Sequence, residues 1–164
     1  MVTINLISLI WEFKTKAMKN ILIPLELTNN AIEERIVETA IAYAKSLGAN
    51  CWIVHVAAPD PDFVGYGVGP KYIRNELAEN LRKEHRQIQA ITARFKEENI
   101  VAEGLLIQGA TQEMIKEEVE TLKIDLLILG NKKHSFIDVL FKGSIVDDLM
   151  DEVNIPILLI PDEA

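Results

Sequence analysis

The sequence predicts an α/β fold in which a parallel sheet lies between layers of helices. Five short apolar runs alternate with four stretches whose apolar residues recur at helical spacing. Strands buried on both faces of a parallel sheet are near-continuous apolar runs, as these are. Regular alternation of strand and helix favours a doubly wound sheet with right-handed crossovers. The periodicity alone leaves the strand order open.

Length and charge narrow the class of protein. The chain has 164 residues, the size of one domain with a sizeable core. Its formal net charge of −8 argues against nucleic-acid and anionic-membrane partners, which bind Lys and Arg. No apolar run approaches the ~20 residues of a membrane span.

The single cysteine, Cys51, lies inside an apolar run and excludes an intramolecular disulfide. A buried strand thiol in a reducing cytoplasm is therefore expected. Residues 1–17 are apolar but lack a basic region and a cleavage site, so they are not predicted to be a signal peptide. We expect them to be an N-terminal extension of a domain that spans residues 18–164.

The first half of the domain is predicted to contain two strands and the helix between them. Ile21–Leu25 is the first apolar run. Asn30 and Glu33 have the spacing of a capping box at the start of a helix, and Gly48 is expected to end that helix. Cys51–Val56 is the second expected strand.

A Gly- and Pro-rich loop over residues 58–70 precedes a long helical pattern that is expected to stop near Asn99. The third strand is predicted over Val101–Ile107, and the third helix follows the turn at Gly109–Thr111. Ile124–Leu129 is the fourth expected strand.

The segment Asp125–Ser144 combines the parts of an anion site. An apolar strand ends at Gly130, a polar loop follows, and Gly143 and Ser144 open the fourth expected helix. Parallel strands end in crevices, and helix N-termini present free N–H groups. The last apolar run, Ile155–Ile160, is the fifth expected strand.

These elements together resemble the universal stress protein family. The resemblance covers Met18 to Pro161 and is carried by five segments: Ile21–Pro24, Val54–Val56, Gly109, Asp125–Gly130 and Ile155–Pro161. It implies a three-layer Rossmann-like fold of the adenine nucleotide alpha hydrolase type, with strand order 3-2-1-4-5. It also implies a homodimer through Ile155–Ile160. The apolar character of that run supports the dimer independently, because an uncovered apolar edge strand promotes aggregation.

Nucleotide-binding members of the family carry the pattern G-x2-G-x9-G-(S/T). Here Gly130, Lys133, Gly143 and Ser144 occupy its positions without insertion. Lys133 departs from the second glycine, and Glu26 stands where the family usually has Asp after the first strand.

The two departures leave the function open between two interpretations. A glycine lets backbone approach phosphate closely, which Lys133 hinders, yet Lys133 also supplies a cation for phosphate. Glu26 can still accept hydrogen bonds from ribose hydroxyls, but it crowds a pocket shaped for Asp.

In the first interpretation the chain is a regulatory module of the stress response that binds ATP or another adenine nucleotide, with Mg2+ held mostly by phosphate oxygens. The resemblance implies adenine near Leu25 and Val54 to Val56, ribose near Glu26 and Gly130, and phosphates near Lys133 and the start of the fourth helix. The full set of expected nucleotide-binding residues is Pro24, Leu25, Glu26, Thr28, Val54, Val56, Leu129, Gly130, Lys133, Gly143, Ser144 and Ile145.

In the second interpretation Lys133 and Glu26 have closed the site, and the chain is a dimeric interaction protein that binds no nucleotide. A third possibility, an unrelated transferase or hydrolase, has the least support, because no catalytic cluster, general base or metal-ligand spacing occurs. At most, slow ATP hydrolysis is expected. His55 lies beside the expected crevice, where a structural role is predicted.

Overall fold

The computed structural model describes residues 18–27, 31–57, 71–131 and 153–161. They form a five-stranded parallel sheet in the order β3-β2-β1-β4-β5, which confirms the predicted fold class and strand order. The strands are β1 (Asn20–Pro24), β2 (Asn50–Ala57), β3 (Ala102–Gln108), β4 (Leu126–Asn131) and β5 (Ile157–Pro161). The helices in these ranges are α2 (Ala31–Leu47), α3 (Lys71–Glu97) and α4 (Thr111–Thr121). The helix expected from Ser144 lies outside the described residues.

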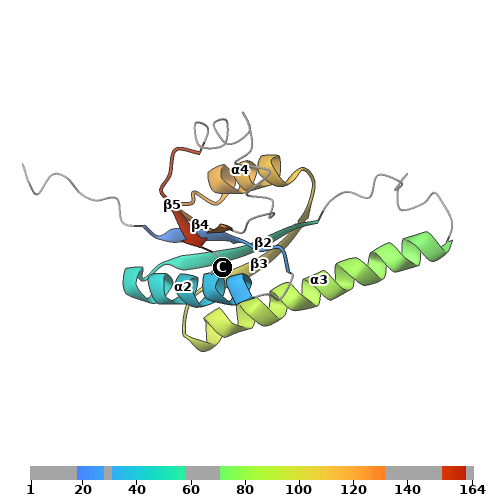
Figure 1. The fold of residues 1–164 in the computed structure, drawn as a ribbon, viewed down its shortest axis with the longest axis horizontal. Helices are drawn as coiled ribbons and strands as arrows, with labels where there is room; N and C mark the ends of the chain where they lie inside the picture. The colour runs from blue at the N-terminus through green and yellow to red at the C-terminus, as the bar shows by residue number, and fades with distance from the viewer. Residues whose placement is uncertain (1–17, 28–30, 58–70, 132–152, 162–164) are drawn as a thin grey trace, which may run out of the picture.

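The sheet separates two layers of helices, as Figure 1 shows, with α2 and α3 on one face and α4 on the other. Side chains alternate between the faces along each strand. Ile21, Ile23 and Leu25 therefore belong to the core beneath α2 and α3, whereas Leu22 and Val54 belong to the core beneath α4.

Three strands begin later than the apolar pattern predicts. The third begins at Ala102, and the side chain of Val101 before it is 67% exposed. The fourth begins at Leu126, and Asp125 before it joins the start of β1: its N–H donates to the carbonyl of Asn20, and its buried carboxylate accepts hydrogen bonds from the backbone N–H groups of Lys19 and Asn20. The fifth begins at Ile157.

The predicted helix ends are confirmed. Gly48 follows α2 with φ of 62°, and Asn99 follows α3 with φ of 60°. Glycine and asparagine are the residues that adopt this left-handed conformation most readily, so each stops its helix at low cost.

The predicted capping box is only half described, because Asn30 lies outside the described residues. Its partner Glu33 is buried, and its Oε1 accepts a hydrogen bond of 2.7 Å from the N–H of Leu27. Glu33 thus reaches back to the segment that leaves β1.

The longest helix, α3, packs on the sheet through its second half, where Ile88 and Phe95 are fully buried. Its first half extends past the sheet (Figure 1). Within the described ranges, no helix combines the length and apolar character needed to cross a bilayer.

Strands β1 and β4 part at the carboxyl end of the sheet. They pair at Ile21–Leu126 and Leu22–Leu127, and beyond these pairs β1 continues to Pro24 and β4 to Asn131. In contrast, β1 pairs with β2 along its whole length. The connections change direction between β1 and β4, which makes this the switch point where ligands bind in open α/β sheets.

Candidate functional site

A cavity of about 320 Å³ lies at the carboxyl ends of β1 and β2. This volume falls at the lower end of the ~300–1,000 Å³ typical of small-molecule pockets. Its lining comes from the end of β1, the end of β2 and the start of α4: Pro24, Leu25, Glu26, Val54, His55, Val56 and Thr111.

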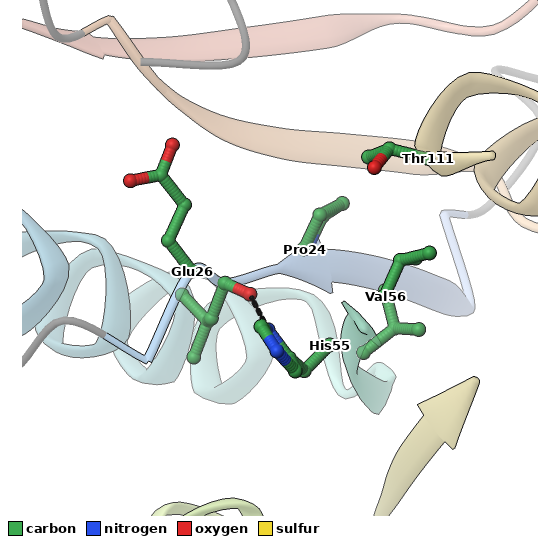
Figure 2. A pocket seen from close by; sticks show the side chains of 7 residues that line it. Pro24, Glu26, His55, Val56 and Thr111 are labelled. Atoms are coloured by element: carbon green, nitrogen blue, oxygen red, sulfur yellow. Dashed lines mark hydrogen bonds between the residues drawn. The ribbon is translucent and has the colours of Figure 1, made fainter. Parts of the chain in front are cut away.

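Strand alternation decides which side chains face α4. Val54 and Val56 pack with the core beneath that helix. Figure 2 shows the side chains of Pro24 and Glu26 on the same side of the strands as Thr111, with His55 on the other side. The cavity therefore combines apolar walls with one carboxylate and one hydroxyl.

Two hydrogen bonds fix the backbone of the lining where β1 ends. The N–H of Leu25 donates to the carbonyl of Val54 over 2.8 Å. On the α3 side, Nδ1 of His55 lies 2.8 Å from the carbonyl oxygen of Leu25, the contact drawn in Figure 2. His55 has the structural role that the sequence predicts.

Thr111 is a lining residue that the sequence interpretation missed. It opens α4, whose preceding residue Ala110 provides no side-chain cap. The free N–H groups of a first helical turn carry partial positive charge, so this end of α4 favours an anion beside the cavity. The turn signal at Gly109–Thr111 predicted the helix start, but not that this start would meet the ends of β1 and β2.

The structure brings together five of the predicted binding residues in this one cavity: Pro24, Leu25, Glu26, Val54 and Val56. Two others, Leu129 and Gly130, lie on β4 across the switch point and are not among the lining residues. Leu129 is buried beneath α4, and Gly130 faces α2, where an added Cβ would lie 2.7 Å from Ile36 Cδ1. The remaining five, Thr28, Lys133, Gly143, Ser144 and Ile145, lie outside the described residues.

Nucleophilic and metal chemistry find no support in the described part of the chain. Cys51 is fully buried in β2, and burial raises the pKa of its thiol to about 12, so the sulfur stays protonated. Among residues 18–27, 31–57, 71–131 and 153–161, no cluster of three acidic, His or Cys side chains could hold a metal ion.

A model of the universal stress protein family matches residues 18–161. A universal stress protein of Thermus aquaticus is 28% identical over 142 residues, which are 87% of this chain and 98% of that protein.

Solved structures share the fold at lower identity. A universal stress protein in complex with cAMP superposes with a TM-score of 0.62 at 17% identity, over 88% of this chain and 98% of that one. The universal stress protein of Archaeoglobus fulgidus in complex with dAMP gives a TM-score of 0.59 at 14% identity, again over 88% of this chain and 98% of the other.

Proposed function

The chain belongs to the universal stress protein family, and from that premise we propose that it binds an adenine nucleotide at the carboxyl ends of β1 and β4 and acts as a regulatory module of the stress response. The observation that carries the proposal is the cavity at the ends of β1 and β2, because the residues expected around adenine converge on it together with Glu26, which is expected at the ribose. Two solved relatives are complexes with cAMP and with dAMP, both adenine nucleotides.

The cavity has both apolar and polar lining residues, as a nucleoside requires. Pro24 and Val56 offer apolar side chains to the faces of a purine, above the buried Val54. The carboxylate of Glu26 can accept hydrogen bonds from ribose hydroxyls. The nucleotide's phosphates would then extend across the switch point toward the end of β4, where Gly130 is the penultimate residue of the strand.

Glu26 is one methylene longer than the aspartate usual in the family, which raises the possibility of a blocked pocket. The cavity of about 320 Å³ exists with Glu26 in its wall. This argues against closure of the nucleoside part of the site by Glu26. A Glu26→Asp variant should therefore change affinity only modestly.

Phosphate binding is proposed from the sequence pattern, with Lys133, Gly143, Ser144, Ile145 and Thr28 as the expected contacts and Mg2+ accompanying a triphosphate. We propose that Lys133 contributes a positive charge to the phosphates in place of the close backbone approach that glycine allows. Lys133→Gly should then weaken ATP binding and leave adenosine binding unchanged. Tighter ATP binding by this variant would instead identify Lys133 as an obstruction.

The proposal is tested by calorimetric titration of the purified protein with ATP at millimolar concentration and with Mg2+. A saturable isotherm is expected, and nucleotide should be released when the freshly purified protein is denatured. A flat isotherm without released nucleotide would overturn the proposal. At most slow hydrolysis should accompany binding, because the sequence offers no evident general base.

The alternative function, a dimeric interaction protein without nucleotide, draws on the position of β5. This strand ends the sheet, and its apolar residues Ile157, Leu158 and Leu159 are only partly buried. We propose that Ile155–Ile160 pairs with a second copy of the chain in the cytoplasm. Light scattering should give a dimer mass, and Leu159→Lys should produce monomers. A dimer that binds no nucleotide would favour this function over the first.

A further inference from the structure

The segment Leu25–Leu27 carries Glu26 from the end of β1 toward α2, and its backbone is held on both sides of Glu26. The bonds come from side chains of other elements, namely His55 on β2, Glu33 on α2 and Gln87 on α3. Each bond is to the main chain of Leu25 or Leu27, so none of them depends on the side chain of Glu26.

On the N-terminal side of Glu26, the carbonyl of Leu25 is held by His55. A carbonyl oxygen only accepts hydrogen bonds, so Nδ1 of His55 must carry the hydrogen that meets the oxygen of Leu25 at 2.8 Å. Nε2, on the far side of the ring, lies 4.0 Å from Oε2 of Glu84 on α3. Glu84 falls between Leu81 and Ile88 on the stripe of α3 that faces the sheet. At 4.0 Å the two atoms form no hydrogen bond, so the contact that fixes the main chain is the one through Nδ1.

On the C-terminal side of Glu26, the N–H of Leu27 is held by Glu33. Its Oε1 accepts from the N–H of Leu27 at 2.7 Å, although the residue is only 6% exposed. Leu27 itself has φ of 58°, a left-handed conformation that branched residues rarely adopt. Its carbonyl also lies 3.5 Å from Nε2 of Gln87. Such a conformation persists only where the surroundings hold it.

We propose that Glu33 and His55 are positioning residues that lock Leu25–Leu27 in its ligand-ready conformation in the free protein. The inference rests on the proposed nucleotide function. With both neighbours of Glu26 fixed, its carboxylate meets the ribose without the entropic cost of ordering a loop. The role explains why the carboxylate of Glu33 is buried, although charged side chains are rarely buried in proteins.

Pairs of variants separate positioning from mere packing. Glu33→Gln keeps an oxygen that can accept from the N–H of Leu27, whereas Glu33→Leu removes it. Similarly, Asn at position 55 can place its side-chain N–H near the position of Nδ1, whereas Gln reaches toward the position of Nε2. We expect Glu33→Leu and His55→Gln to weaken ATP binding by about tenfold or more, and Glu33→Gln and His55→Asn to bind nearly as the natural protein does. Glu98→Leu, which removes an exposed carboxylate at the opposite edge of the sheet, is the matched control and should leave binding unchanged.

The backbone N–H of Leu27 gives a readout that needs no nucleotide. In the free protein it should exchange slowly with solvent by NMR, and Glu33→Leu should abolish this protection while other amides of β1 and β2 stay protected. Fast exchange in the natural protein, or unchanged ATP affinity in folded Glu33→Leu and His55→Gln, would overturn the inference. No ATP binding by the natural protein would overturn the proposed function instead, and a protected Leu27 amide would still support the lock.

Discussion

The two edges of the sheet that are formed by the strand ends carry cavities of nearly equal size. These carboxyl and amino edges are built from different elements. The cavity at the carboxyl edge has a volume of about 320 Å³, and the one at the amino edge about 330 Å³. The second lies where α2 and α3 end and where β2 and β3 begin, and it is lined by Ala44, Lys45, Gly48, Ala49, Asn50, Glu98, Asn99, Ile100 and Val101.

The charge of the helix ends distinguishes the two edges, although the cavity volumes do not. At the amino edge α2 and α3 present their C-termini, whose partial negative charge disfavours an anion. An exposed ion pair between Lys45 and Glu98 joins those helix ends. At the carboxyl edge α4 presents its N-terminus, and buried polar groups such as Glu33 fix the main chain. The charge of the helix ends therefore favours an anionic ligand at the carboxyl edge, a preference that cavity size alone does not reveal.

The largest expected effect comes from removing the carboxylate at the carboxyl edge. Glu26→Ala should lower nucleotide affinity by about 10- to 100-fold, since hydrogen bonds to charged groups contribute about 1.5–3 kcal/mol. Lys45→Ala at the other edge should leave affinity unchanged. Calorimetric titration of both variants checks the comparison, and equal losses would remove the distinction between the edges.

A smaller effect should follow from filling space at the end of β4. A Cβ at Gly130 would lie 2.7 Å from Ile36 Cδ1 and 3.2 Å from Ile32 Cδ1. Gly130→Ala should therefore lower the free energy of unfolding by about 1–2 kcal/mol, because those side chains must turn within a packed core. Urea unfolding measures the loss. If the variant were as stable as the natural protein, the side chains of Ile32 and Ile36 would be less tightly packed against β4 than these distances indicate.

The glycine at the amino edge is constrained by backbone rather than by space. Gly48 has φ of 62°, and an added Cβ would meet nothing within 4 Å. Gly48→Ala should cost about 1 kcal/mol, the penalty of a left-handed conformation. Gly48→Asn should retain most of the stability, because asparagine tolerates that conformation. If both variants lost the same amount in urea unfolding, crowding would be the cause instead.

The smallest effect is expected from the exposed ion pair between Glu34 on α2 and Arg94 on α3. The hydrogen bond from Arg94 lowers the pKa of Glu34, against the opposing effect of burial. Arg94→Ala should cost less than about 1 kcal/mol at pH 7, because such pairs are screened by solvent.

The pH dependence of that cost follows from the lowered pKa. The contribution of the pair is complete above 4.5, the ordinary pKa of the carboxyl, and is lost as the pH falls through the lowered value in the folded protein. The difference in urea stability between Arg94→Ala and the natural protein should shrink as the pH falls below 4.5. A difference that grows there would point to a role for Arg94 beyond this pair.

Local pattern in the sequence was enough to predict the strands of the sheet and the helix ends. Apolar runs favour buried parallel strands wherever they occur, and Gly48 and Asn99 stop helices through their own backbone preferences. The resemblance to a known family then supplied the strand order, which aligns the ends of β1 and β2 and brings Glu26 near Val54 and Val56.

Tertiary structure alone decided the contacts that cross between layers. Thr111 joins the cavity because α4 packs on the face to which Val54 and Val56 point, and no residue near Thr111 in the chain encodes that meeting. The sequence pattern pairs Glu33 with Asn30 at the start of a helix, whereas the bond that the fold shows joins Glu33 to Leu27, six residues earlier. Local preferences act within about one helical turn, while these contacts depend on how whole elements pack, which is why the sequence predicted the edge of the sheet but not the bonds that hold it.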